Sequence, residues 1–577
     1  MTSAVRALVV MLAFGLLVLP AAVSANGDPS DRAADWAITT EIQILGLNDF
    51  HGNLEPPTGS GGRIGGTEAA GNAGGVEFLA THVRALRATN ANTLFVSAGD
   101  LIGATPLISA LFHDEPSIEA FNQMGLDYNG VGNHEFDEGV DELLRMQDGG
   151  CHPVDGCQDG DPFLGADFEF LAANVAYKDT GKTIFAPFAI HHFPGVKVAV
   201  IGMTLEGTPS IVSPAGISHV NFTDEADTVN ALVPQLKKQG IETIIVLLHE
   251  GGATSNPLNA TTINQCGTLT RALPPIVQAM DDEVDVVVTG HTNWAVNCVI
   301  DGKIVTGAAS AGRLVTDIDL TVSRATKDVV AAKVENRIVT RTVDKAPDLT
   351  TLVTKYKTLS APFANRVIGR ITGDITRTAN AAGESALGDV IADSQLAATT
   401  PANLGGAVIA FMNPGGIRTD LLFGQISGGE QPGQVTYGEA FNVQPFGNSL
   451  VTMTLTGAQI DTLLEQQWFV NPTTGVLTTN ILQVSNGFSY AYNPTAAIGS
   501  RIDPASIKLG ATTLGAATPY RVTVNSFLAE GGDNFFVLRD GTSRLGGDVD
   551  LDAIEKYFTA NPGGVAPGPQ NRITRLP

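Results

Sequence analysis

Short, nearly continuous apolar runs recur through the first half of the chain. They occupy residues 41–48, 93–98, 197–203, 242–248 and 284–289. Strands of this kind are typical of sheets that are covered on both faces, by helices or by a second sheet. Segments 74–89 and 226–239 between them have apolar residues at helical spacing and are predicted helices. Residues 38–345 are therefore predicted to form a layered α/β domain.

The pattern changes after residue 345. Leu and Val recur at helical spacing over residues 346–366, which predicts a linker helix that serves as a hinge. Residues 367–577 are richer in Gly, Thr and Asn and contain short β-like runs, so a second, α+β domain is expected there. Two domains also suit the length, because 577 residues exceed what one core usually organises.

The N-terminus has the pattern of a signal peptide. Arg6 precedes an apolar run that ends at Pro20, and the small residues before position 26 suit cleavage after Ala25. The alternative is an uncleaved membrane anchor, but the run is shorter than the ~20 residues of a spanning helix. We expect an exported mature chain without a transmembrane segment, secreted or associated with the cell envelope, from which residues 1–25 are removed.

The four cysteines suit an oxidising compartment. An even number in an exported chain favours two disulfides, and three pairings are possible. The pairing that we favour joins Cys151 to Cys157 across a short Gly/Asp-rich loop and Cys266 to Cys298. A metal site made of thiolates is disfavoured, because no C-x-x-C pair occurs.

The charge of the chain limits its partners. Asp and Glu number 59 against 34 Lys and Arg, a formal net charge of −25. Nucleic acids and anionic membranes attract clustered cations, so neither is an expected partner. An anionic substrate would need local cations or bound metals to reverse the field.

Five strand-like runs of the first domain, including the short run before Gly132, are followed by polar residues that can bind metals. These are Asp49 and His51, Asp100, Asn133 and His134, His249, and His291 and Asn293. Strand ends of α/β sheets converge on a crevice where ligands bind. His nitrogen with carboxylate or amide oxygen suits Zn²⁺ or Mn²⁺, and two such ions share a bridging carboxylate. On extended backbone, Asp49 and His51 would point to the same face.

Each motif also has a purely structural interpretation. Asp before or after Gly is common in turns, and "GNHE" could be a helix N-terminus that Asn133 caps. A single His after a strand is often only a packed or capping residue. Five such coincidences at strand ends favour a metal site over this interpretation.

The residues of these motifs resemble those of a known protein family. "LNDFHGN", "SAGDLIGATP", "GNHEFDEG", "LLHEGG" and "TGHTN" resemble, in order and spacing, the motifs of the calcineurin-like metallophosphoesterases. In particular, the chain is similar to the exported 5′-nucleotidases, also called bifunctional UDP-sugar hydrolases/5′-nucleotidases. The resemblance implies a four-layer β-sandwich flanked by helices, a C-terminal substrate-binding domain and a large rotation between the two.

The resemblance also implies residue roles. One divalent metal would be held by Asp49, His51, Asp100 and Asn293, and the other by Asp100, Asn133, His249 and His291, with Asp100 as the bridge. His134 resembles the catalytic histidine, and Asp137 would orient its ring and favour the imidazolium. Glu135 is expected to face away and cap the following turn.

Three motifs of the second domain resemble the family's nucleoside pocket. They supply Asn413 and Arg418, Phe446 and Asn448, and Phe527 and Asp533. Arg418 can bind a carboxylate or phosphate, the two Phe rings can stack on a base, and Asp533 can accept from ribose hydroxyls. Core packing is the alternative for each Phe. Relatives carry two arginines upstream; Arg377 matches one, but Ala381 occupies the other position, which leaves the preferred substrate open.

We therefore expect an exported dimetal phosphohydrolase that converts nucleoside 5′-monophosphates to nucleoside and phosphate, by in-line attack of a metal-activated hydroxide. Alternatives on the same site are a UDP-sugar hydrolase, a 2′,3′-cyclic-nucleotide phosphodiesterase or a broad phosphoesterase. A non-catalytic exported nucleotide-binding or adhesion protein is the alternative of another class. The sequence does not indicate an oligomeric state.

Overall fold

The computed structural model describes residues 38–577 apart from 58–61, 66–72, 211, 213, 427–428 and 471–476. The predicted signal peptide lies outside the described residues. Among the helices that are described, none combines the length and the apolar character needed to cross a bilayer.

The N-terminal domain is built on two six-stranded sheets. The first has the order β16 (Val329–Ile338), β15 (Leu314–Ser323), β1 (Thr39–Leu47), β2 (Thr93–Ser97), β3 (Tyr128–Gly130) and β4 (Glu169–Leu171). The second has the order β13 (Ala295–Ile300), β14 (Lys303–Ala308), β12 (Val286–Thr289), β9 (Thr243–His249), β7 (Val196–Thr204) and β6 (Phe188–Phe193). The five predicted strands are confirmed as β1, β2, β7, β9 and β12.

The strands that carry the motifs run parallel within their sheets. In the first sheet β1 pairs with β2 and β2 with β3, all parallel. In the second sheet β9 lies between β7 and β12, again in parallel pairs. Parallel pairing brings the carboxyl ends of neighbouring strands to the same edge of a sheet.

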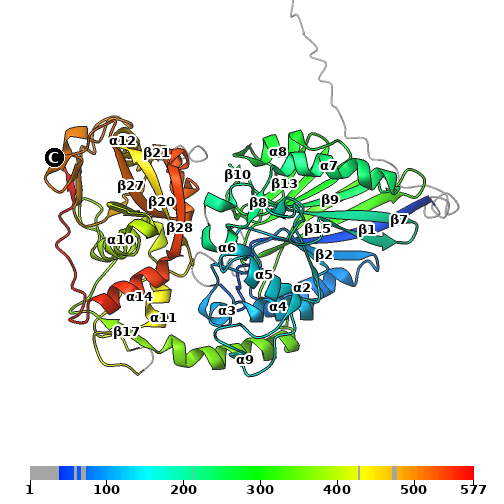
Figure 1. Cartoon of the computed structure of the whole chain (residues 1–577), viewed down its shortest axis with the longest axis horizontal. Coiled ribbons are helices and arrows are strands. Elements are labelled where there is room, and N and C mark those ends of the chain that lie inside the picture. Colours follow the sequence, from blue (N-terminus) through cyan, green and yellow to red (C-terminus); the bar gives the residue numbers. More distant parts are fainter. Residues whose placement is uncertain are drawn as a thin grey trace, which may run out of the picture. The chain divides into compact units, whose positions relative to one another are not determined.

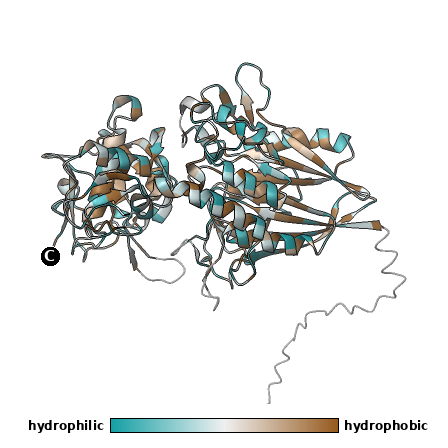
Figure 2. Ribbon diagram, turned by 90° about the horizontal axis from the view of Figure 1, so that it is seen from below, coloured by the Kyte–Doolittle hydropathy of each residue, from teal (hydrophilic) through white to brown (hydrophobic). Residues whose placement is uncertain are grey.

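Alternation along each strand divides the domain into four layers. Ile42 and Ile44 of β1 join the core between the two sheets, whereas Leu45 and Leu47 join the core beneath the helices. Helices α2 (Val76–Arg87), α4 (Glu115–Met124) and α5 (Val140–Asp148) cover the first sheet, and α7 (Glu225–Lys238) and α8 (Leu273–Ala279) cover the second (Figure 1). The strands are correspondingly hydrophobic along most of their length (Figure 2). The predicted helices 74–89 and 226–239 are confirmed as α2 and α7.

The predicted linker helix is α9 (Pro347–Ala364). Its Leu349, Leu352, Val353 and Tyr356 are part of the core beneath the first sheet. The first three turns therefore pack on the N-terminal domain. A hinge, which stays a prediction, would have to lie beyond them.

The C-terminal domain contains a five-stranded and a four-stranded sheet. The larger has the order β23 (Gln483–Val484), β18 (Ile409–Met412), β27 (Pro519–Asn525), β20 (Ser449–Thr456) and β28 (Thr542–Val549). The smaller has the order β26 (Thr512–Thr513), β25 (Lys508–Leu509), β24 (Phe488–Tyr492) and β29 (Ile573–Arg575). Helices α10 (Ala386–Thr399) and α14 (Asp550–Ala560) pack on one face of the larger sheet, and α12 (Gly457–Glu465) packs on the other.

Both favoured disulfides are present. Cys151 is bonded to Cys157 and Cys266 to Cys298. The first closes a loop after α5, and the second ties the segment before α8 to β13.

Candidate metal centre

The predicted ligands follow the carboxyl ends of five strands. Asp49 and His51 follow β1, Asp100 follows β2, and Asn133 follows β3. His249 is the last residue of β9, and His291 follows β12. Two sheets therefore contribute to the centre, three strands from one and two from the other, rather than a single open sheet.

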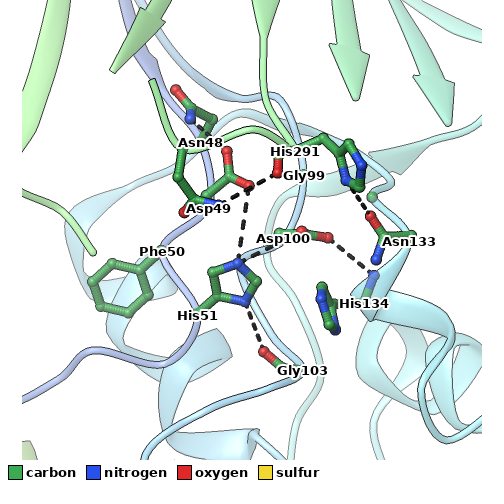
Figure 3. Close-up of polar contacts among 12 residues, drawn as sticks. Asn48, Asp49, Phe50, His51, Gly99, Asp100, Gly103, Asn133, His134 and His291 are labelled. Carbon is green, nitrogen blue, oxygen red and sulfur yellow. Dashed lines mark hydrogen bonds and ion pairs between the residues drawn. The ribbon is translucent and has the colours of Figure 1, made fainter. Parts of the chain in front are cut away.

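Asp100 lies at the middle of this group (Figure 3). Its Oδ2 is 3.6 Å from His51 Nε2 and 3.1 Å from His249 Nε2. His51 Nε2 is in turn 3.9 Å from Asp49 Oδ1. One carboxylate thus touches both of the predicted ligand sets, which is the position that a bridging ligand needs.

Asn133 joins the other two histidines. Its Oδ1 lies 3.1 Å from His249 Nε2 and 2.9 Å from His291 Nδ1. Its side chain does not cap the following 3₁₀ turn, so the helix N-cap interpretation of "GNHE" is wrong. Asn293 is different: it is exposed, its Nδ2 donates to the His291 carbonyl at 3.4 Å, and no described contact joins it to Asp49 or Asp100.

The backbone at five of the predicted ligands is left-handed rather than extended. Asp49 and His51 have φ of 48° and 47°, and His291 and Asn293 have φ of 68° and 60°. The expectation that the Asp-x-His spacing acts through strand alternation is therefore wrong: β1 ends at Leu47, and both side chains sit on left-handed turns. Asp100 adds a φ of 53°. Left-handed backbone at non-glycine residues is costly and gathers at functional sites.

Main-chain carbonyls orient two of the histidines. His51 Nδ1 lies 2.8 Å from the Gly103 carbonyl, and His249 Nδ1 lies 2.7 Å from the Ala98 carbonyl. A carbonyl accepts a proton from Nδ1, so Nε2 of each ring is the nitrogen available to a metal. Both Nε2 atoms face Asp100.

The donor set fits divalent cations. Asp49 and Asp100 are both almost fully buried, and Asp49 Oδ1 has no hydrogen-bond partner among the described residues. Burial raises the pKa of Asp49 to about 7. A cation bound between these carboxylates and imidazoles would compensate that burial, and nitrogen with oxygen donors suits Zn²⁺ or Mn²⁺.

His134 and Asp137 form a pair next to this group. His134 Nδ1 lies 2.8 Å from Asp137 Oδ2, and the His134 backbone N–H donates to Asp100 Oδ1 at 3.0 Å. Burial by itself lowers the pKa of His134, but the Asp137 and Asp100 carboxylates outweigh it and raise this pKa to about 10. The two carboxylates therefore favour the protonated ring, and its Nε2 edge points away from Asp137.

Two residues that matter locally were misjudged or missed. Glu135 does not face away or cap a turn: it is 3% exposed and accepts backbone hydrogen bonds from the loops of Asp100 and Gly132. Asn48 donates to Asp49 Oδ2 at 2.5 Å and to the Ala309 carbonyl at 2.6 Å. In the sequence, the only indication that Glu135 or Asn48 matters was its position inside one of the quoted motifs.

The predicted residues of the second domain gather at one edge of the larger sheet. Asn413 follows β18, Phe527 follows β27, and Asn448 directly precedes β20. Because β27 is parallel to β18 and antiparallel to β20, these three positions lie at the same edge. Phe446 and Phe527 are 44% and 45% exposed, so neither ring is packed in the core.

Polar contacts connect the other members of this group. Asn413 Nδ2 donates to Asp533 Oδ2 at 3.0 Å, and the Arg418 guanidinium lies 5.6 Å from the Phe446 ring centre. Arg377 reaches the Ile417 carbonyl next to Arg418 at 3.4 Å. Sequence reasoning missed Asn525, which donates to Asn413 Oδ1 at 2.9 Å and so orients that amide.

Comparison with known proteins assigns both halves of the chain. The calcineurin-like phosphoesterase model matches residues 42–294, and the 5′-nucleotidase C-terminal domain model matches residues 367–540. The chain is 31% identical over 561 residues to Cell wall protein Lmo0130 of Listeria monocytogenes, covering 92% of this chain and 68% of that protein. The chain belongs to the 5′-nucleotidase family of calcineurin-like phosphoesterases.

Two further comparisons describe this family member. It is 30% identical over 540 residues to Endonuclease YhcR of Bacillus subtilis, covering 92% of this chain but only 41% of that relative. The crystal structure of a Thermus thermophilus 5′-nucleotidase precursor matches with a TM-score of 0.57 and 26% identity, over 93% of this chain and 99% of that one. The predicted fold class and the predicted class of enzyme, a 5′-nucleotidase-like metallophosphoesterase, are thereby confirmed.

Several expectations are not decided by family membership, among them export, the two-metal mechanism and the preferred substrate. The domain boundaries and the role of each site residue stay predictions. The exclusion of nucleic acid as a partner also stays a prediction, because one relative of this family member is named an endonuclease.

Proposed function

We propose that this chain is an exported dimetal phosphohydrolase that converts nucleoside 5′-monophosphates to nucleoside and phosphate. The observation that carries the proposal is the position of Asp100, whose Oδ2 contacts His51 on one side and His249 on the other. A single carboxylate between two sets of donors is what a pair of ions requires.

The residues that would hold the ions are Asp49, His51, Asp100, Asn133, His249, His291 and Asn293. When bound, such ions lower the pKa of water and polarise a phosphoryl group. His134 would contact the phosphoryl oxygens through Nε2, because Asp137 holds its Nδ1. A fixed imidazolium stabilises negative charge that develops on these oxygens.

The C-terminal group would bind the leaving nucleoside. Phe446 and Phe527 offer exposed aromatic faces to a base, and Arg418 and Asp533 offer a cation and an acceptor for the polar parts of the substrate. Because the ions and this group belong to different domains, the domains would have to close around the substrate. Export is supported by the N-terminal pattern, by the two disulfides and by a relative named a cell wall protein.

Phosphate release across a substrate panel tests this proposal. With Mn²⁺ or Zn²⁺ added, we expect AMP and other 5′-monophosphates to be hydrolysed faster than UDP-glucose and 2′,3′-cyclic AMP. Arg418→Ala is expected to raise the KM for AMP about tenfold or more, while hydrolysis of p-nitrophenyl phosphate, which lacks a nucleoside, changes little. An unchanged KM for AMP would refute the assignment of this pocket.

Phosphodiester hydrolysis is a second candidate, favoured by the relative named Endonuclease YhcR. The same panel therefore includes single-stranded DNA and RNA. Faster cleavage of a nucleic acid than of AMP would replace the proposed substrate, whereas a metal-free chain without activity would support a binding or adhesion protein.

A further inference from the structure

Glu135 is a buried carboxylate inside the candidate centre. It is neither a predicted metal ligand nor a member of the His134–Asp137 pair. It lies between His134 and Phe136 in a 3₁₀ turn and is 3% exposed. Burying an ionised carboxylate is costly unless it is fully hydrogen-bonded. Its partners therefore indicate why the chain keeps it there.

Each Glu135 oxygen accepts two hydrogen bonds. Oε2 accepts from the backbone N–H of Asp100 at 2.9 Å and of Gly132 at 2.7 Å. Oε1 accepts from the backbone N–H of Leu101 at 3.0 Å and from Asn129 Nδ2 at 3.2 Å. With both oxygens committed to donors, Glu135 is not itself placed to be a metal ligand.

The three backbone donors belong to two different loops, and Asn129 lies in β3. Asp100 and Leu101 lie in the loop after β2, whereas Gly132 lies after β3 and precedes Asn133. The carboxylate therefore joins the loop of the central ligand Asp100 to the loop of the amide ligand Asn133. A second bond links the same loops, from the His134 backbone N–H to Asp100 Oδ1 at 3.0 Å.

The packing at Gly132 shows how closely the loops approach. A Cβ atom at this position would lie 2.2 Å from Asp100 Oδ1 and 2.8 Å from Glu135 Oε2. Only glycine allows such an approach. The two loops are thus in direct van der Waals contact at Gly132, and a larger side chain there would force them apart.

We propose that Glu135 is a positioning residue that holds Asp100 and Asn133 at the separation that two metal ions require. This inference rests on the proposed function, because it assumes that these residues bind metal. Partners of metal ligands typically change metal affinity about 10–100-fold when they are removed.

Two substitutions separate the geometry of Glu135 from its charge. Glu135→Gln keeps the length of the side chain but can accept at one oxygen only, so two of the four bonds are lost in either amide orientation. Glu135→Asp keeps the charge but is one methylene shorter and cannot reach both loops. Asp141→Asn, which removes an exposed carboxylate from α5, is the matched control.

The measurement is Mn²⁺ binding to the full chain, followed by the magnetic coupling of the bound ions in electron paramagnetic resonance. Wild type and Asp141→Asn are expected to bind two ions and to show the spectrum of a coupled pair. Glu135→Gln and Glu135→Asp are expected to bind Mn²⁺ about 10–100-fold more weakly and to lose the coupled spectrum. At saturating Mn²⁺, KM for AMP should stay near the wild-type value while kcat falls.

Every other outcome overturns the inference. A wild-type spectrum in both variants would show that the bonds are not needed, and a wild-type spectrum in Glu135→Asp alone would show that only charge matters. Loss of folding in both variants at all Mn²⁺ concentrations would indicate a general folding role. If wild type itself binds no Mn²⁺ pair, the proposed function fails, which is a different result.

Discussion

At the scale of single residues, the centre depends on side chains whose environment sets their chemistry. His134 is the clearest case, because its Nδ1 is held by Asp137 at 2.8 Å and its backbone N–H donates to the central ligand. The ring is thus fixed relative to Asp100, although His134 is not a predicted metal ligand. Its removal should affect the reaction more than the binding of metals.

We predict that His134→Ala lowers kcat for AMP about 10²–10⁴-fold, the usual range for a positioned acid or base, with little change in KM or in metal content. Asp137→Asn should lower kcat less, because an amide still contacts Nδ1. Steady-state kinetics together with metal analysis of the purified variants checks both statements.

His219→Ala, which removes an exposed histidine, is the control for these variants. A loss of metal from His134→Ala equal to its loss of activity would contradict the assignment and make His134 a ligand. That outcome is a real alternative, because His134 offers a ligand atom within 4.8 Å of those of His51 and Asp100.

At the scale of elements, the connection between α3 (Leu107–Ala110) and α4 is held by an ionic contact. His113 Nδ1 lies 2.8 Å from Glu138 Oε2, and its Nε2 lies 3.0 Å from Asp155 Oδ2 in the Cys151–Cys157 loop. Burial by itself lowers the pKa of His113, but the bonds to Glu138 and Asp155 raise it to about 9.

The raised pKa predicts a pH-dependent contribution to stability. In the unfolded chain the pKa of histidine is about 6.5, so the contribution is fully present below that pH. It is lost as the pH rises through about 9, where His113 releases its proton in the folded protein. His113→Gln should therefore lower Tm by about 1–2 °C at pH 6, since partly exposed ion pairs contribute about 1 kcal/mol or less.

Thermal unfolding at pH 6, 8 and 10 tests this prediction, with His192→Gln as the exposed control. The difference between His113→Gln and wild type should shrink towards pH 10. A difference that is equally large at all three values would show that His113 contributes through packing instead, for example through its stacking on His152 at 3.7 Å.

The elements themselves were largely predictable, whereas the turns between them were not. Continuous apolar runs identified β1, β2, β7, β9 and β12 because a buried strand leaves no polar position on either face. Left-handed backbone at Asp49, His51 and Asp100 carries no such pattern, because it is imposed by tertiary contacts. The contacts of Glu135 could not be predicted for the same reason. Two of its partners, Leu101 and Asp100, lie 34 and 35 positions away in the sequence.

At the scale of the whole molecule, the two domains have separate hydrophobic cores. Residues up to Tyr356 contribute to the cores around the two large sheets, and those from Ile368 onward form cores of their own. All predicted metal ligands belong to the first part, which predicts that metal removal acts on one domain only.

We predict that chelation lowers the unfolding temperature of the N-terminal domain and leaves that of the C-terminal domain unchanged. An ion present at 100 times its Kd stabilises the folded state by about 2.7 kcal/mol, so removing two ions should lower Tm by about 5–10 °C. The reason is local: without a cation, the buried Asp49 and Asp100 carboxylates lie close together with Asp49 Oδ1 unpaired among the described residues.

Calorimetry of the full chain, with and without EDTA, separates the two transitions if the domains unfold independently. Restoring Mn²⁺ should return the lower transition to its first position, which distinguishes metal loss from damage by the chelator. In Asp141→Asn the shift should persist, because an exposed acid is not a ligand; in Asp100→Asn it should vanish, because the residue common to both ligand sets is gone. A shift that affects both transitions equally would mean that the ions stabilise the contact between domains, and the two-ion centre within the first domain would then not account for their effect.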